Sequence, residues 1–337
     1  MRYIRFQIGN GPASYGVLRG DQVRRLDGDI FHGYRETFEE YELQSVHLLA
    51  PVNPGKIIGI GANYKSFLDA KKREYPKRPR IFLKPASSII GDRDAIICPD
   101  KSHEIHFEGE LGVIIGKTCS QISEENAMSN VFGYTCVNDV TDRTMLEEDG
   151  IWDRGKGVNT FFPIGPCITD EIDGMNVELE TRVNGEVRQH RNTSDMYFSI
   201  SQLIAYISNY MTLNPGDVIA TGTPVGTGCL NILDTVEVEI KGIGILRNQM
   251  IERIARVECI PMVYHMEHPI YSGTGRCDAR QLLLVRIYAD NGMVGLGEAA
   301  PYGGPVQTTQ EVIEREIAPM LIGEDPANTE RIWHKCY

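Results

Sequence analysis

Three features are missing from this 337-residue sequence, and each absence excludes a class of protein. Its eight cysteines form no C-x-x-C motif, which argues against a zinc site or a disulfide framework and favours reduced thiols. No apolar run approaches the roughly 18 to 20 residues that span a bilayer, and the first residues lack the apolar core of a signal peptide. An excess of basic residues is also missing, because 46 Asp and Glu outnumber 34 Lys and Arg and give a net charge of −12. We therefore expect a cytoplasmic protein that binds neither membranes nor nucleic acid.

The sequence divides into three regions of different pattern. Residues 1–50 contain short alternating segments and predict a small N-terminal β lobe. A linker rich in Pro and Gly opens a larger β-rich region over 51–252, and residues 253–337 predict a smaller α+β region. Together these patterns predict an α+β, β-rich protein. The expected strands lie at 3–8, 13–19, 22–26, 110–115, 133–138, 177–183, 218–220, 235–240, 280–289 and 293–299, with a hairpin turn at 290–292. The expected helices are one at 199–210, one with Val312, Ile313, Ile317, Met320 and Leu321 on one face, and one that begins after residue 326.

The segment 106–116 carries the strongest local signal for chemistry. Glu108 and Glu110 lie two residues apart and lead directly into an apolar, β-branched run. In a strand both carboxylates would point to one face, with His106 in line behind them. Two like charges about 7 Å apart repel each other unless a cation neutralises them. The alternative is an ordinary strand whose glutamates form surface salt bridges.

A third carboxylate, Asp139, follows the strand expected at 133–138. Added to Glu108 and Glu110, it would complete an all-oxygen ligand set that suits Mg²⁺ or Mn²⁺. Spacing alone leaves a second role open, in which Asp139 caps a turn.

Two further features could bind an anion. Lys156 stands among glycines that lead into an apolar strand, where its cation could hold a substrate carboxylate. The Gly- and Thr-rich loop at 221–228 could bind an anion through its backbone N–H groups, although it lacks the P-loop motif of nucleotide-binding proteins. A surface lysine and a set of tight turns are the alternatives.

In this order the segments resemble the motifs of the fumarylacetoacetate hydrolase family. The resemblance covers about residues 50–250 and implies a mixed-β catalytic domain. The matching strings are F-E-G-E-L from Phe107, N-D-V-T-x-R from Asn138, K-x-x-x-T-F-x-P-x-G-P from Lys156, V-N-G-E at 183–186, M-T-L-x-P-G-D-V-I-A-T-G-T-P from Met211 and G-I-G-x-L-x-N at 242–248.

The resemblance also implies which residues form the site. Enzymes of this family cleave, decarboxylate or tautomerise acylpyruvates and related 2-oxo acids, usually as dimers. We therefore expect a small-molecule 2-oxo acid as substrate, Mg²⁺ as cofactor with Mn²⁺ as the alternative, and a homodimer. The implied metal ligands are Glu108, Glu110 and Asp139, the implied catalytic residue is Lys156, and the implied substrate-binding residues are Tyr64, Arg143, Thr160 and Thr223.

One departure from the family pattern concerns the base that activates water. The family motif N-Y-x-x-H-x-x-E begins here at residue 63, but Phe67 replaces the His and Ala70 replaces the Glu. Phenylalanine cannot accept a proton, which argues against hydrolysis by the usual pair. Asp69 or His106 could replace the base, and the alternative for His106 is a core side chain that accepts a backbone hydrogen bond.

Residues 251–337 carry a separate resemblance. The strings at 284–299 and 321–326 are similar to the N-terminal capping domain of the mandelate racemase branch of the enolase superfamily. The barrel that carries the catalytic residues of that superfamily is absent from the sequence, and the sequence stops inside a predicted helix. We therefore expect a truncated, fused appendage whose apolar helix stripe has lost its usual packing partner.

These observations predict a metal-dependent enzyme that acts on C–C bonds of 2-oxo acids. Acylpyruvate hydrolysis is the family activity, whereas Phe67 favours oxaloacetate-type decarboxylation or tautomerisation. The alternative is a catalytically impaired binding or scaffold protein that keeps the fold. The lost His–Glu pair and the tail favour that alternative, while the three carboxylates and Lys156 favour an enzyme.

Overall fold

The computed structural model describes residues 1–9, 11–272, 275–289, 293–300, 305–326 and 328–336. The chain forms two compact units, Met1–Met250 and Ile251–Tyr337. Each unit has its own hydrophobic core. Strands dominate both units, so the expected α+β, β-rich class is confirmed. The further division at residue 50 stays a prediction.

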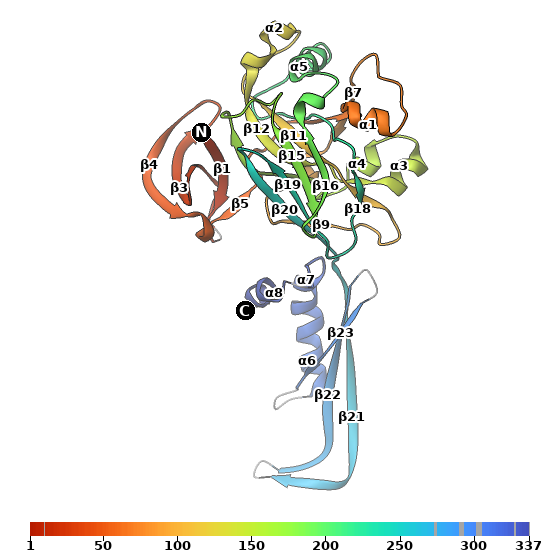
Figure 1. Ribbon diagram of the computed structural model, residues 1–337. Helices are drawn as coiled ribbons and strands as arrows, with labels where there is room; N and C mark the ends of the chain where they lie inside the picture. The colour runs from red at the N-terminus through yellow and green to blue at the C-terminus, as the bar shows by residue number, and fades with distance from the viewer. Residues whose placement is uncertain (10, 273–274, 290–292, 301–304, 327, 337) are drawn as a thin grey trace. The chain divides into compact units, whose positions relative to one another are not determined.

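A twelve-stranded mixed sheet runs through the first unit (Figure 1). The N-terminal lobe is part of this sheet, because β1 pairs with β14 in an antiparallel ladder. Strand β17 pairs with β6 in parallel, which makes the sheet mixed. In spatial order its strands are β4 (Gly33–Glu42), β3 (Gln22–Asp29), β2 (Ser14–Arg19), β1 (Arg2–Gln7), β14 (Phe162–Thr169), β12 (Val131–Asn138), β11 (Gly109–Ile115), β17 (Val218–Ala220), β6 (Ile57–Gly61) and β7 (Arg80–Lys84), with β5 (His47–Leu49) on β1 and β8 (Ile89–Ile90) on β14.

Two smaller sheets and several short helices complete the first unit. None of the helices in the described part of the chain is long and apolar enough to cross a membrane. The five-stranded sheet contains β16 (Glu186–Asn192), β15 (Glu178–Val183), β19 (Thr235–Ile240), β20 (Gly244–Ile251) and β9 (Ala95–Ile97), and the three-stranded sheet contains β13 (Thr141–Asp142), β10 (Ile105–Phe107) and β18 (Gly228–Cys229). The helices are α1 (Lys65–Ala70), α2 (Glu124–Ala127), α3 (Arg143–Asp149), α4 (Asp153–Lys156) and α5 (Ile200–Ser208), with 3-10 turns at Leu43–Ser45, Ala86–Ser88, Met128–Asn130 and Thr193–Asp195.

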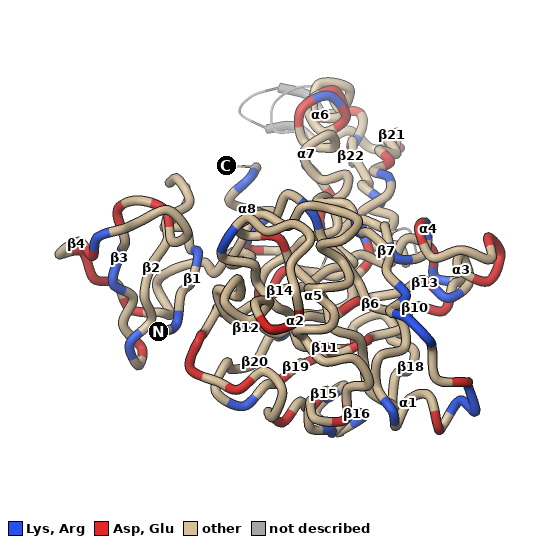
Figure 2. The backbone as a smooth tube through the Cα atoms, turned by 90° about the horizontal axis from the view of Figure 1, so that it is seen from above, with Lys and Arg blue, Asp and Glu red and all other residues tan. Residues whose placement is uncertain are grey.

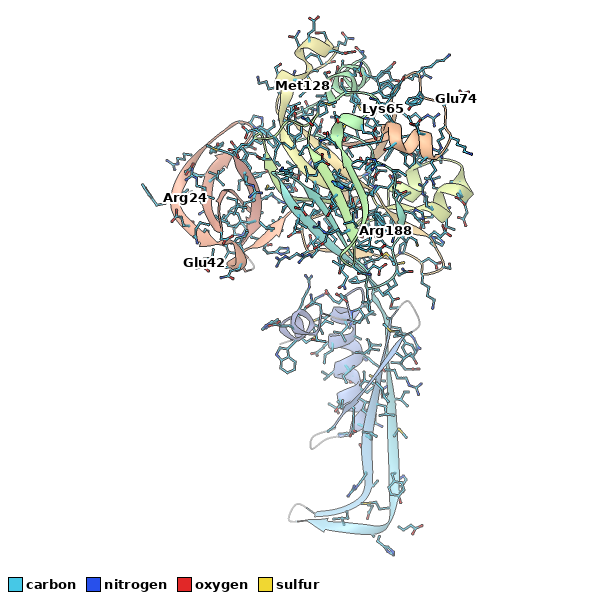
Figure 3. The ribbon with its side chains drawn as sticks, viewed as in Figure 1. Arg24, Glu42, Lys65, Glu74, Met128 and Arg188 are labelled. Atoms are coloured by element: carbon cyan, nitrogen blue, oxygen red, sulfur yellow. The ribbon has the colours of Figure 1, made fainter. Side chains whose placement is uncertain are left out.

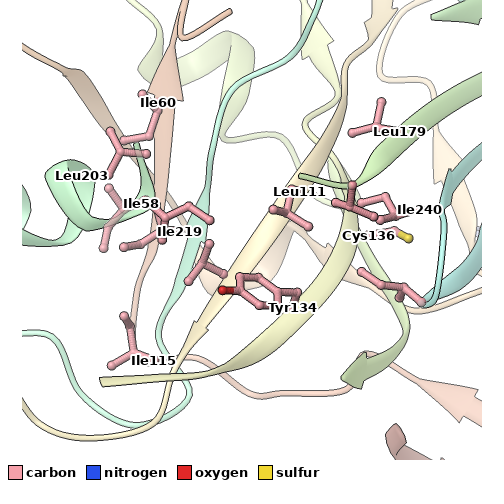
Figure 4. Close-up of a cluster of buried hydrophobic side chains, with 14 of the residues drawn as sticks. Ile58, Ile60, Leu111, Ile115, Tyr134, Cys136, Leu179, Leu203, Ile219 and Ile240 are labelled. Carbon is pink, nitrogen blue, oxygen red and sulfur yellow. The ribbon is translucent and has the colours of Figure 1, made fainter. Parts of the chain in front are cut away.

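The main core lies between the large sheet, the five-stranded sheet and α5 (Figure 4). Leu111 of β11, Leu203 of α5 and Ile240 of β19 are all completely buried there. Helix α5 matches the helix expected at 199–210, and a capping box explains its start: Ser199 accepts from the Gln202 N–H, while the Gln202 side chain accepts from the Ser199 N–H. Strand β11, which carries Glu110, is buried along its whole length.

The strand expected to run from His106 onward is interrupted at Glu108. Strand β10 ends at Phe107 and β11 begins at Gly109, and the two belong to different sheets. At the break, side chains replace the usual ladder partners: the Glu108 N–H donates to Asn138 Oδ1 at 2.9 Å and the Gly109 N–H donates to Gln189 Oε1 at 3.0 Å. The two glutamates therefore lie where two sheets meet.

The N-terminal lobe is larger than the sequence pattern indicated. Strand β4 was not expected, because its residues are mostly charged and exposed. It is held by cross-strand ion pairs with β3: Arg24 lies directly opposite Glu40 and bonds to it, and Arg25 pairs with Glu39 at 2.8 Å. Figure 2 shows both basic and acidic residues on β3 and β4. Charge pairing, rather than apolar alternation, thus defines this edge strand.

The second unit is a three-stranded antiparallel sheet with helices packed on it. Two residues of the helical stripe that was expected to lack a partner pack on this sheet: Ile313 is buried with Leu283, and Ile317 packs beside it. Val312, at the end of α6, is 42% exposed and is not part of the buried stripe, and a π-helical turn follows it. The long first strand was not expected, and the hairpin turn at 290–292 lies outside the described residues. The elements are β21 (Ile254–Ser272), β22 (Gly275–Ala289), β23 (Val294–Ala299), α6 (Val306–Val312), the π turn Ile313–Ile317, α7 (Ala318–Leu321) and α8 (Thr329–Cys336).

We predict that the first unit folds without the second. A chain that ends after residue 252 should keep its strand-rich circular dichroism spectrum and a cooperative thermal unfolding transition, because its core clusters are internal to that unit. It should also keep any enzymatic activity of the full chain. A shortened protein that unfolds without a cooperative transition would contradict this prediction.

Candidate active site

The three carboxylates predicted to share a metal converge on one place. Glu108 lies at the break between β10 and β11, Glu110 is in β11, and Asp139 directly follows β12. Each offers a carboxylate oxygen, and these oxygens lie within 4.8 Å of one another. Strand pairing explains the convergence, because Gly109 lies opposite Asn138 and the Asp139 N–H donates to the Glu108 carbonyl at 2.9 Å. All three residues are buried.

Two buried lysines neutralise this cluster. Lys156, at the end of α4, donates to Glu108 Oε2 at 2.8 Å and to Asp139 Oδ2 at 2.5 Å. Lys84, at the end of β7, donates to Asp139 Oδ1 at 2.6 Å. Lys156 was expected here, but Lys84 was not. The only sequence signal for Lys84 is its place on the inward face of β7 with Phe82, two residues earlier.

The charges of the cluster shift its pKa values in different directions. Burial raises the pKa of Glu110 well above its usual range, and the negative charges of Asp139 and Glu108 raise it further. Burial acts to raise the pKa of Asp139 as well, but the cations of Lys156 and Lys84 outweigh it and hold this pKa below its usual range. Burial lowers the pKa of Lys84. For Lys156 burial is outweighed by Asp139 and Glu108, which raise its pKa.

Tyr64 and Arg143 supply polar atoms without a partner in the described part of the chain. Tyr64 is completely buried, and its hydroxyl makes no hydrogen bond there. Burial and the charge of Glu110 raise the pKa of Tyr64, so the phenol is a neutral donor. The Arg143 Nη2 lies 3.6 Å from Glu108 Oε1, while its buried Nε has no hydrogen-bond partner. Orphaned buried donors of this kind call for a ligand, and their substrate-binding role stays a prediction.

The two threonines implied as substrate ligands already use their hydroxyls. Thr223 Oγ1 donates to the Gly109 carbonyl at 2.9 Å and accepts from Gln189 Nε2 at 2.8 Å. Thr160 Oγ1 accepts from the Ile97 N–H at 2.9 Å. The Thr223 hydroxyl therefore contacts the segment that carries the glutamates, and the Thr160 hydroxyl contacts the end of β9. Gln189 was not expected from the sequence, although its amide joins Thr223 to the segment that carries the glutamates.

The residue in the family's base position is part of the core. Phe67 is 7% exposed and packs with the main hydrophobic cluster. Asp69 lies on the exposed side of α1, and its carboxylate accepts from the Tyr75 hydroxyl at 2.9 Å. His106 has a buried Nδ1 with no partner among the described residues, so the expected backbone hydrogen bond is not seen. Burial and the charge of Arg143 lower the pKa of His106 and keep its ring neutral.

An asparagine anchors α1 beside the site. Asn63 Nδ2 donates to the carbonyls of Phe198 at 3.1 Å and Thr221 at 2.9 Å. Its Oδ1 accepts from the Phe198 N–H at 2.9 Å. Gly222, next in the loop, leaves no room for a side chain: an added Cβ would lie 2.8 Å from Asn63 Cβ. The N-Y motif thus attaches α1 to the loop after β17.

The donor set fits a hard divalent cation. Three buried carboxylates provide only oxygen ligands, the preference of Mg²⁺ and Mn²⁺. Among the described residues neither lysine forms an ion pair with Glu110, whose Oε2 accepts from the Gly222 N–H, so the charge of this carboxylate lacks direct compensation. A divalent cation would supply it. The orphaned polar atoms of Tyr64 and Arg143 are suited to an oxygen-rich ligand beside such an ion.

The fold and the site define a β-rich protein with a buried acidic centre, and comparison with known proteins identifies the family. Residues 56–251 match the fumarylacetoacetate (FAA) hydrolase C-terminal family, residues 1–51 the Rv2993c-like N-terminal family, and residues 256–337 the N-terminal domain of mandelate racemase / muconate lactonizing enzyme. Because the first match covers more than half of the sequence, the chain belongs to the fumarylacetoacetate hydrolase family. Both resemblances predicted from the sequence are confirmed.

Individual relatives are similar over most of their own length. An uncharacterized protein of Archaeoglobus fulgidus is 45% identical over 238 residues, which are 69% of this chain and 93% of that protein. The structure of 2-hydroxyhepta-2,4-diene-1,7-dioate isomerase from Mycobacterium marinum is 37% identical with a TM-score of 0.69, covering 74% of this chain and 98% of that one. Maleylpyruvate hydrolase from Sphingobium sp. SYK-6, in complex with manganese(II) and pyruvate, is 31% identical with a TM-score of 0.63 and the same coverages.

We predict that Glu110→Gln stabilises the metal-free protein at high pH. A raised carboxylate pKa in the folded state means that stability is lost as pH rises through that pKa. The amide removes this loss, so in a chelator the variant should melt above wild type at pH 8, by about 2–4 °C per kcal/mol gained. The difference should shrink as pH falls and Glu110 takes up its proton.

The same pair of proteins tests for cation binding. Added Mg²⁺ should raise the melting temperature of wild type but not of Glu110→Gln. Glu74→Gln is a matched control, because Glu74 is an exposed carboxylate in the loop after α1 (Figure 3). An equal response of Glu110→Gln and wild type would argue against a metal at this site.

Proposed function

We propose that this protein is a divalent-metal-dependent enzyme that acts on 2-oxo acids of the acylpyruvate type. The observation that carries the proposal is the buried cluster of Glu108, Glu110 and Asp139 with Lys156 among them. Burying three carboxylates is costly for folding, and such a cluster is retained where charge is needed for chemistry. Membership of a family of hydrolases and isomerases supports the same conclusion.

Each residue of the site would have its own role. Glu108, Glu110 and Asp139 would hold the metal, with Mg²⁺ proposed and Mn²⁺ as the alternative. When bound, such an ion acts as a Lewis acid that stabilises negative charge developing on the substrate's oxygen atoms. The Arg143 guanidinium and the Tyr64 hydroxyl, both with unused donors, would bind and orient the substrate carboxylate. Lys156 holds two of the carboxylates in place and supplies a positive charge beside them.

The position of Phe67 favours chemistry that needs no activated water. A buried phenyl ring excludes water and cannot take a proton, and Asp69 faces away on the exposed side of α1. Loss of CO₂ from a 2-oxo diacid requires stabilised enolate charge and no base, whereas keto–enol exchange also needs a group that accepts one proton but no hydroxide. We therefore propose oxaloacetate-type decarboxylation or tautomerisation as the main activity. Of the two similar structures, the isomerase supports tautomerisation, whereas the maleylpyruvate hydrolase supports the alternative of acylpyruvate hydrolysis.

A substrate panel tests the proposed function. Oxaloacetate and acylpyruvates would be followed by ultraviolet absorbance with Mg²⁺, with Mn²⁺ and with a chelator. We expect metal-dependent turnover, faster for oxaloacetate or enol substrates than for acylpyruvate hydrolysis, and loss of turnover in Asp139→Asn. Absence of turnover with every substrate and metal would favour the scaffold alternative instead.

Restoring the missing pair should restore hydrolysis. The double substitution Phe67→His with Ala70→Glu places a base and its carboxylate partner one helical turn apart on α1. We expect acylpyruvate hydrolysis to rise by up to about 10²- to 10⁴-fold, the usual contribution of a positioned base. Phe67→Leu, which repacks the same site without a base, is the control. Full hydrolytic activity of wild type would contradict the argument and direct attention to His106.

A further inference from the structure

The second lysine of the site, Lys84, has no part in the function proposed above. Its side chain is 0% exposed. Its ammonium donates to Asp139 Oδ1 at 2.6 Å and to the Val140 carbonyl at 3.2 Å. A fully buried ammonium that is held by two protein oxygens is not placed to touch a substrate. Its charge nevertheless acts directly on a proposed metal ligand.

The two lysines contact the cluster in different ways. Lys156 lies between two carboxylates, with bonds to Glu108 Oε2 and Asp139 Oδ2. Lys84 approaches Asp139 at the other oxygen, Oδ1, and completes its coordination with a main-chain carbonyl. It comes from β7, an outer strand of the large sheet, and the β6–β7 ladder fixes it at the pair Ile57–Lys84. Lys84 is therefore a fixed part of the scaffold.

The charge balance of the site gives this lysine a function. In the buried cluster three ionised carboxylates face Lys84 and Lys156, and the Arg143 guanidinium lies 3.6 Å from Glu108, so the metal-free site is close to charge balance. We propose that Lys84 is a resident counter-ion: it holds the metal-free site together through Asp139, and its charge weakens the affinity of the site for a divalent cation. This inference rests on the proposed metal site. Because Lys84 already neutralises part of the charge of Asp139, the site would bind the divalent cation less tightly and could release it. More of the positive charge of the cation would then act on the substrate.

Lys84 would stabilise the metal-free protein but weaken metal binding. This combination distinguishes a counter-ion from a lysine that only supports the fold. Removing the charge should destabilise the metal-free protein, because Asp139 loses one of its two cations in a buried site. It should also tighten metal binding, because a like charge next to a ligand is gone. A lysine that only supports the fold would give the first effect without the second.

The test uses Lys84→Gln in the full chain, because glutamine can still donate to Asp139 Oδ1 but carries no charge. The control is Lys56→Gln, which likewise removes the charge from a lysine paired with a buried aspartate, here Asp217 at 2.5 Å. The dissociation constant for Mn²⁺ would be measured from the electron paramagnetic resonance signal of free Mn²⁺, and the melting temperature would be measured in a chelator.

We expect Lys84→Gln to melt below wild type in the chelator and to bind Mn²⁺ about ten- to a hundredfold more tightly. Lys56→Gln should lower the melting temperature and leave the Mn²⁺ dissociation constant unchanged. An unchanged or weaker affinity for Mn²⁺ in Lys84→Gln would overturn the proposal.

A second variant tests the proposal if Lys84→Gln folds poorly or if wild type binds no metal. In the chelator, adding Asp139→Asn to Lys84→Gln removes the stranded negative charge, so the double variant should melt above Lys84→Gln. A double variant that is no more stable would overturn the counter-ion role. Wild type that binds no Mn²⁺ would instead overturn the proposed metal site, while recovery in the double variant would still support the Lys84–Asp139 pairing.

Discussion

The burial of three carboxylates within 4.8 Å of one another is the constraint on which the site depends. Such a cluster survives folding only if cations and hydrogen-bond donors surround it. Helix α4 brings Lys156, β7 brings Lys84, and the loop after β17 brings the Gly222 N–H, which donates to Glu110 Oε2 at 2.8 Å. Elements far apart in the sequence thus meet here because each neutralises or binds one of the same carboxylates.

The sequence predicted those elements whose pattern has a single physical cause. Helix α5 was predicted because its apolar residues recur at helical spacing, and β11 was predicted because its apolar, β-branched run is typical of a buried strand. Strand β4 was missed because ion pairs with β3 stabilise it, and charged residues carry no strand pattern. The break at Glu108 was missed because it depends on Asn138 and on a glutamine 80 residues away.

For the site, sequence reasoning reached the residues whose chemistry is visible in a motif. The three carboxylates and Lys156 stand in recognisable strings, and the structure brings them together. Lys84 and Gln189 were missed, because a lysine in an alternating strand and a glutamine in a polar strand look like surface residues. Burial is a property of tertiary packing, and only the folded chain reveals which polar side chains point inward.

The anchoring of α1 by Asn63 has a consequence for how this fold can diversify. All the polar contacts of that side chain go to main-chain groups of Phe198 and Thr221, so they are indifferent to the residues that follow on the helix. The contacts of Asn63 therefore remain when positions 67 and 70 change, and only the packing of Phe67 in the main core is altered. Attachment and reactivity are encoded by different residues of one short segment, which lets a single scaffold pass between reaction types by few mutational steps.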